Sequence, residues 1–387
     1  MFFWVGLLLY FSCLQMQLVA RGALIWESTH TASFVGLISA AGALPLLLLS
    51  PLGGVISDKL DRKLITHSGQ SISALFFLLI AIAAFTNTIT WQHLLVVSIL
   101  MGSIHAFMVP ARQALVPQLV GPENTNNAIA LNGAGSSIVM LIAPAISGFL
   151  YTFMGAHGIF SLMAALAFIS ALFIRSISPH PVTKSENPLP IFAEIREGIS
   201  YAKSDGLIVI LLFTGIITSV LTIPFKFLLP VYADIVYGKD AWAVGILIST
   251  IGLGTLLSSI GMAIIGNRNR GKMLILSSLA SGIGLLAVTL VTSLYIAIPL
   301  MLLIGFGEAG RRVLNISLLM EHVENHYRGR IMSVFMMSFG LMPIVLLPAG
   351  YAFDLLGPRV TIGSLSVLII VITILLFITQ DKLRNVQ

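Results

Sequence analysis

GVISDKLDRK, from Gly54 to Lys63, is a short charged stretch between two long apolar segments. Residues 29–57 and residues 64–111 contain no Asp, Glu, Lys or Arg. A membrane-spanning helix needs about 20 predominantly apolar residues. A charged turn between two such segments is typical of an aqueous hairpin between two transmembrane helices. This stretch therefore indicates that the chain crosses a membrane repeatedly.

The composition supports the same interpretation. Apolar residues make up 57% of the chain, charged residues only 9%, and the mean hydropathy is +1.00, which excludes a soluble domain of ordinary composition. The net charge of +6 could suggest a nucleic-acid partner, but the basic residues are scattered among short loops, so we expect no nucleic acid. Cys13 is the single cysteine, so no internal disulfide can form.

Apolar runs separated by Gly, Pro, Asn or charged residues predict an all-α protein with twelve transmembrane helices. The first run has no basic residues before it and is longer than a signal-peptide core, which favours a first span over a cleaved signal. The expected spans are residues 2–26, 32–56, 64–85, 91–113, 127–153, 157–176, 206–229, 241–265, 272–292, 295–319, 329–354 and 359–380.

The basic residues predict the orientation. With the amino terminus placed inside, all but four of the 21 lysines and arginines lie at or towards the cytoplasmic side. The four exceptions are Arg21, Lys226, Lys239 and Arg359. We therefore expect a multi-pass protein of the plasma or inner membrane with both termini in the cytoplasm.

The longest polar interval divides the chain nearly in half. It predicts a six-helix half at 1–176, a cytoplasmic linker at 177–205 and a second six-helix half at 206–387. The linker carries four prolines and then an amphipathic pattern, which is typical of a helix lying at the membrane interface.

The two halves show a weak internal repeat. Gly148 and Gly155 bracket FLYTFM in the fifth expected helix, while Gly350 and Gly357 bracket YAFDLL in the eleventh. Such an equivalence is the pattern of a parallel repeat. The second half has Asn267 where the first has Asp58, so any gating role of the charged turn belongs to the first half.

Polar and ionisable groups inside membrane spans are costly and usually face a cavity or a partner. The deepest ones lie on the first, fourth, seventh and tenth expected helices. They are Gln15, Gln17, Arg21, His105, Lys226, Glu308 and Arg311.

Each of these residues also has an ordinary structural interpretation. Glu308 and Arg311 are three residues apart and could neutralise each other, and Lys226 could extend to the outer headgroups. Arg21 could extend outwards or pair with Glu27, and His105 could be a hydrogen-bonded packing residue. The occurrence of such residues on all four helices is stronger evidence for a cavity than any one of these residues alone.

The spacing of Gly54, Asp58, Arg62 and Lys63 resembles the loop between the second and third helices of the major facilitator superfamily, with Asp61 in place of that motif's second glycine. QMQLVARGALIW from Gln15, VPARQALVPQLV from Val109 and LLPVYADIVYG from Leu228 resemble its enterobactin-exporter-like and macrolide-efflux-like branch. APAISG from Ala143 is a variant of an exporter signature of the superfamily.

The resemblance implies two rocking halves, alternating access and a central site lined by the first, fourth, seventh and tenth helices. It implies secondary active export of a small amphipathic compound, drug-like or siderophore-like, by proton exchange, with Glu308 and His105 as candidates for proton coupling. Gly54, Asp58, Arg62 and Lys63 would then form the cytoplasmic gate. The expected partners are a small-molecule substrate, protons and the lipid bilayer, with no cofactor and a monomeric state.

The sequence also raises other interpretations. Glu321, His322, Glu324 and His326 have a spacing that could hold a metal ion, but a solvated turn explains it better. The sequence has no HExxH, GxSxG or Walker motif, which argues against an enzyme or an ATP-driven pump. A non-transporting receptor or assembly factor, or an importer of a small anionic solute, stays open as an alternative.

Overall fold

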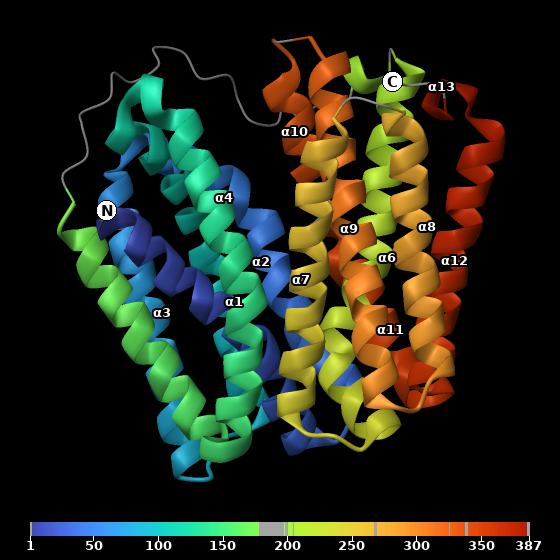
Figure 1. Cartoon of the computed structure of the whole chain (residues 1–387). Helices are drawn as coiled ribbons and strands as arrows, with labels where there is room; N and C mark the ends of the chain where they lie inside the picture. The colour runs from blue at the N-terminus through green and yellow to red at the C-terminus, as the bar shows by residue number, and fades with distance from the viewer. Residues whose placement is uncertain are drawn as a thin grey trace. The chain divides into compact units, whose positions relative to one another are not determined.

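A computed structural model describes residues 2–177, 197, 200–203, 205–266, 269–324, 326–336 and 340–384. Within these ranges the regular structure is helical (Figure 1). The elements are α1 (Phe2–Thr29), α2 (Ala32–Lys59), α3 (Arg62–Phe85), α4 (Trp91–Arg175), α6 (Gly206–Tyr237), α7 (Ala241–Ile265), α8 (Arg270–Leu290), α9 (Leu294–His322), α10 (Arg328–Met336), α11 (Met342–Leu356), α12 (Pro358–Thr379) and α13 (Asp381–Arg384).

The long helix α4 contains three of the predicted spans. Its backbone leaves the helical conformation at Gly121 and again at Gly155, so the helix is interrupted twice. Conversely, α10 and α11 together occupy one predicted span, residues 329–354. With these two adjustments, the described helices correspond to the twelve predicted spans, and the four-residue α13 follows the last of them.

The two turns that end the internal repeat have similar backbones. Gly155 has φ 66° and ψ −175°, and Gly357 has φ 85° and ψ 161°. A side chain is disfavoured at such positive φ values, so glycine allows the chain to leave one helix and enter the next within a single residue. This shared geometry supports the repeat proposed from FLYTFM and YAFDLL.

The chain forms two compact units. The first comprises Met1–Asn187, Phe227–Asp234 and Gly238–Ile246, and the second Pro188–Lys226, Ile235–Tyr237 and Leu247–Gln387. The predicted boundaries at 176 and 205 stay a prediction. Most of the predicted interfacial helix in the linker lies outside the described residues.

In the first unit, α1 and α3 pack against α4 around fully buried aromatic side chains such as Tyr10, Phe77 and Phe160. Ser147, which replaces a glycine of the exporter signature, donates a hydrogen bond of 2.9 Å to the Met16 carbonyl. Cys13 is also fully buried, and its Sγ lies 3.4 Å from the Met163 carbonyl oxygen. Small polar groups therefore hold α1 against the later part of α4.

In the second unit, α8 packs against both α9 and α12 (Figure 1). Leu211, Leu274, Leu318 and Leu383 belong to one buried cluster, so even the short α13 contributes to the core. Such burial of leucine side chains stabilises the packing of the helices against one another.

The surface of the helices is apolar. Ile264 and Leu290, for example, are 80% and 77% exposed. Among the described residues, ten helices are long and apolar enough to span a membrane, before α4 is divided at Gly155 and the shorter α11 is included. Large exposed apolar side chains on such helices are suited to lipid, so the chain is a multi-pass membrane protein.

Candidate functional site

The polar residues that the sequence singled out lie on four membrane-spanning helices and form two groups. Gln15, Gln17 and Arg21 lie on α1 and His105 lies on α4, all in the first unit. Lys226 lies on α6, and Glu308 and Arg311 lie on α9, all in the second unit.

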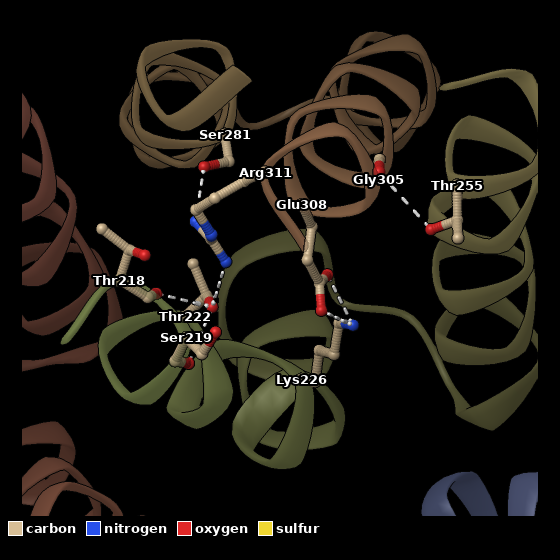
Figure 2. Close-up of polar contacts among 9 residues, drawn as sticks. All are labelled: Thr218, Ser219, Thr222, Lys226, Thr255, Ser281, Gly305, Glu308 and Arg311. Carbon is tan, nitrogen blue, oxygen red and sulfur yellow. Dashed lines mark hydrogen bonds and ion pairs between the residues drawn. The ribbon is translucent and has the colours of Figure 1, made fainter. Parts of the chain in front are cut away.

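An ion pair joins α6 to α9 in the second unit. Lys226 Nζ lies 2.6 Å from Glu308 Oε2 and donates a hydrogen bond of 2.8 Å to Oε1 (Figure 2). The two side chains are only 21% and 24% exposed. A carboxylate and an ammonium at this distance in a membrane helix compensate each other's loss of hydration.

Arg311 is the most deeply enclosed charged residue of this group, with 1% of its surface exposed. Its Nη1 donates to Ser281 Oγ at 3.2 Å and its Nη2 to Thr222 Oγ1 at 3.5 Å. Its Nε has no hydrogen-bond partner among the described residues. The guanidinium is thus held by neutral hydroxyl groups.

The sequence left neutralisation of Glu308 by Arg311 open, and the structure shows that Glu308 contacts Lys226 instead. Both residues lie on α9, but Figure 2 shows their side chains extending in different directions, with Glu308 reaching Lys226 on α6. Spacing along one helix indicates which residues are neighbours but does not identify a closer partner on another helix. Lys226, which could also have extended to the lipid headgroups, forms an ion pair with Glu308 in the structure.

Thr222 can accept a hydrogen bond from Arg311 because its own proton is used elsewhere. Its hydroxyl donates to the carbonyl oxygens of Thr218, at 3.0 Å, and Ser219, at 2.9 Å. The lone pairs of Oγ1 therefore remain for the guanidinium. This arrangement gives α6 an acceptor beside Arg311 without placing a second carboxylate there.

In the first unit, a chain of hydrogen bonds joins α4 to α1 and α3. Ser73 Oγ donates to the Gly69 carbonyl at 2.8 Å and lies 2.9 Å from the Tyr10 hydroxyl, which lies 2.9 Å from His105 Nε2. Since the Ser73 proton is committed to Gly69, Tyr10 donates to Ser73. His105 Nε2 then carries the proton that Tyr10 accepts, which assigns the tautomer from the network.

Arg21 is the basic residue of this first group. Its Nη1 donates to Ser98 Oγ on α4 at 3.2 Å. Glu27, which the sequence offered as a possible partner, instead accepts a hydrogen bond of 2.7 Å from Tyr151. Gln17 is buried and Gln15 partly buried on the same helix α1.

The candidate gate lies at the turn between α2 and α3. Arg62 Nε donates to the Ser57 carbonyl at 3.1 Å, and Ser57 donates to the Gly54 carbonyl at 2.7 Å. Asp61 caps α3, because its Oδ1 accepts a hydrogen bond of 2.8 Å from the Lys63 amide. The carboxylate thus explains the departure from glycine at this position.

Asp58 is near the end of α2, and its side chain lies outside the described part of the structure. Asn267, which occupies the corresponding place in the second half, also lies outside the described residues. The gating assignment therefore stays a proposal.

Two of the four residues whose spacing could hold a metal ion, Glu321 and His322, have other contacts. Glu321 forms an ion pair with Arg270, and His322 Nδ1 lies 2.9 Å from the Leu318 carbonyl oxygen. Within the described ranges, no group of three His, Cys, Asp or Glu side chains is placed to hold a metal ion.

Sequence reasoning missed the hydroxyl groups of the site, namely Tyr10, Ser73, Thr222 and Ser281. A signal for one of them was present. Thr214, Thr218 and Thr222 precede Lys226 at intervals of four, which places a polar stripe along one face of α6. Tyr10 and Ser281 have no comparable pattern and required the fold.

Comparison with known proteins assigns the family. The model of the Major Facilitator Superfamily matches residues 3–347. The chain belongs to the Major Facilitator Superfamily. Members of this superfamily are transporters, which is also the reason for regarding the chain as a non-enzyme.

Several relatives within the superfamily share most of the chain. The Staphyloferrin A transporter of Staphylococcus aureus is 26% identical over 92% of this chain and 89% of its own length. Macrolide efflux protein A of Streptococcus pyogenes is 24% identical, covering 86% and 83%. The enterobactin exporter EntS of Shigella boydii is 24% identical, covering 81% and 75%.

Solved structures support the superfamily fold. The nucleoside transporter NupG has a TM-score of 0.78 at 14% identity, covering 97% of this chain and 99% of its own. A bacterial homologue of the lysosomal transporter Spinster has a TM-score of 0.78 at 14% identity, covering 99% and 96%. The resemblance to both confirms the predicted fold class.

Proposed function

We propose that this protein is a secondary active transporter that exports a small amphipathic compound, drug-like or siderophore-like, by alternating access in exchange for protons. The names of its relatives support efflux, since they include macrolide efflux protein A and an enterobactin exporter. The observation that carries the coupling is the Lys226–Glu308 ion pair between two membrane helices.

Glu308 is the principal candidate for the proton site. Protonation of its carboxylate would remove the negative charge that neutralises Lys226 and leave an ammonium to be satisfied by another group. Since a charge in a membrane helix is costly when unpaired, the proton and the substrate would be linked through this one pair. His105 is the second candidate, because it is the histidine hydrogen-bonded to Tyr10 among the polar residues of the first unit.

The test uses inverted membrane vesicles and a labelled substrate found by a sensitivity panel of drugs and siderophores in an efflux-deficient host. Glu308→Gln should abolish accumulation driven by a pH gradient while retaining exchange at equal concentrations, since exchange needs no proton release. His105→Ala is the matched variant on α4. Accumulation by Glu308→Gln together with its loss in His105→Ala would place the proton site in the first unit.

Import of a small anionic solute is the second candidate. Its support is the cationic excess among the candidate residues of the two units, which include Arg21, Lys226 and Arg311 but only one carboxylate, Glu308. Right-side-out and inverted vesicles distinguish the two directions. A non-transporting receptor would show no counterflow of any labelled compound in proteoliposomes.

We also propose that both termini face the cytoplasm of the plasma or inner membrane, that the chain acts as a monomer, and that the halves are joined by a linker at 177–205. The cytoplasmic gate would consist of Gly54, Asp58, Arg62 and Lys63. Its closed state would depend on the charge of Asp58. Cysteines placed at Lys63, Lys184 and Arg384 should be shielded from an impermeant external thiol reagent, while one at Lys239 should react. External labelling at position 184 would reject this topology.

A further inference from the structure

The group in the second unit carries two enclosed cations and one carboxylate, with the exposed Arg312 next to Arg311 on α9. Glu308 is engaged by Lys226 at 2.6 Å, whereas the contacts described for Arg311 are with the hydroxyl groups of Ser281 and Thr222. Glu308 acts on Arg311 only from a distance, and a buried cation whose hydrogen bonds go to neutral groups costs several kcal/mol relative to water. A charge kept at that cost within a membrane helix indicates a function.

One edge of the Arg311 guanidinium is almost unused. The Nε and Nη2 atoms form the side-on edge, which can bind a carboxylate through two parallel hydrogen bonds. Nε has no partner in the described structure, and the Nη2 contact with Thr222 is 3.5 Å, at the long limit for a hydrogen bond. The Nε and Nη2 atoms could therefore donate to a carboxylate, but no carboxylate contacts them in the described structure.

Glu308 is the carboxylate best placed to use that edge. It precedes Arg311 by three residues on α9, so the two side chains start from the same helical face one turn apart. A change of side-chain rotamer, without movement of the backbone, could transfer Glu308 from Lys226 towards Arg311. Such a transfer would leave Lys226 as the unpaired cation.

We propose that Lys226 binds a carboxylate of the transported compound, and that Glu308 moves to the buried, unpartnered edge of Arg311 when it does so. Before binding, the pair is Lys226 with Glu308; afterwards, Lys226 pairs with the compound and Arg311 with Glu308. The number of ion pairs rises from one to two, so the ligand supplies the missing negative charge. This inference rests on the proposed transport of a small amphipathic compound, whichever way protons move, and names its substrate class, carboxylate-bearing compounds.

Lys226 is the better contact for the ligand because it is reachable. Its side chain is 21% exposed, whereas Arg311 is 1% exposed. A lysine ammonium on a flexible stem can turn its three donors towards an incoming anion, while the planar guanidinium suits a fixed carboxylate on its own helix. The two cations therefore have different tasks.

The first experiment measures binding to the purified protein in detergent, without any gradient. Citrate and salicylate are the probes, each with its neutral amide as control, and the dose dependence of the melting temperature gives the apparent dissociation constant. At least one carboxylate should stabilise the wild-type protein and its amide should not. Lys226→Arg should retain this binding, and Lys226→Gln/Glu308→Gln should lose it while keeping a neutral pair.

Glu308→Gln provides a result that a purely structural role would not give. If Glu308 occupies Lys226 in most molecules of the ligand-free protein, its removal frees the lysine and should tighten carboxylate binding by about tenfold. Loss of affinity in Glu308→Gln, or no stabilisation of any variant by either carboxylate, would reject the proposal.

A double-mutant cycle tests the role of Arg311. Arg311→Gln should weaken carboxylate binding in the wild-type background, since Glu308 loses its second position, and should have little effect in the Glu308→Gln background. Equal weakening in both backgrounds would show that Arg311 acts by its charge alone and would overturn the proposed movement. Because no gradient is involved, these outcomes are independent of whether protons drive transport.

Discussion

The two polar groups of this protein connect equivalent helices by different chemistry. In the first unit, α1 and α4 are joined by neutral hydrogen bonds through Tyr10 and by Arg21 donating to Ser98. In the second, α6 and α9 are joined by the Lys226–Glu308 ion pair. Hydrogen-bonded hydroxyls fix a geometry, whereas an ion pair changes its strength with the charge of either partner. This difference favours the second unit in the proposal that transport is coupled to an ion or a charged substrate.

The largest effect is expected when one partner of the ion pair is removed. Lys226→Met removes the cation that Glu308 contacts and should lower stability by about 2 kcal/mol, less than breaking a fully buried pair, because Glu308 can turn towards Arg311. Thermal unfolding in detergent measures this. Adding Glu308→Gln to the same chain should restore most of the loss, and failure to restore it would mean that Lys226 stabilises the protein by packing.

A smaller effect is expected in the first unit. Tyr10→Phe removes the hydroxyl between Ser73 and His105 and should cost about 1–2 kcal/mol, because two buried groups lose a partner. Gradient-driven transport should continue once protein amounts are matched. If transport stopped while the melting temperature stayed unchanged, the network of His105 would be part of coupling and the contrast between the units would fail.

The repeat predicts equal effects at its two glycine turns. Gly155→Ala and Gly357→Ala should each lower stability by about 1 kcal/mol, because alanine is strained at positive φ. Gly133→Ala is the control, since a Cβ there meets no neighbouring atom and the backbone is helical. Clearly unequal losses of stability at positions 155 and 357 would argue against equivalent turns in the two halves.

The smallest effect is expected at Asp61. Asp61→Gly removes the cap of α3 but leaves a residue that caps helices moderately well, so the loss should be a few tenths of a kcal/mol. Transport should be retained. Asp58→Asn, three residues earlier, should insert normally but lose most transport, because the proposed gate depends on that charge. Full transport by Asp58→Asn would remove Asp58 from the gate.

The sequence was sufficient for the fold because membrane spans are set by length and apolarity, which are local properties. Even the glycine turns at 155 and 357 could be aligned from the flanking residues. The individual side chains Lys226, Glu308 and Arg311 were also found from the cost of placing charge in a span. Their partners were not, since the contact of Glu308 with Lys226 joins residues on separate helices and depends on the packing of α6 against α9.

Cys13 has a practical consequence for studying the motion of the protein. The thiol is fully buried and lies against carbonyl oxygens of Leu9 and Met163, so it should react slowly with thiol reagents. Cys13 is the single cysteine of the chain. Spin labels or fluorophores can therefore be attached to cysteines introduced elsewhere without first replacing Cys13. Distances between two such labels can then be followed by spectroscopy while a carboxylate is added and withdrawn.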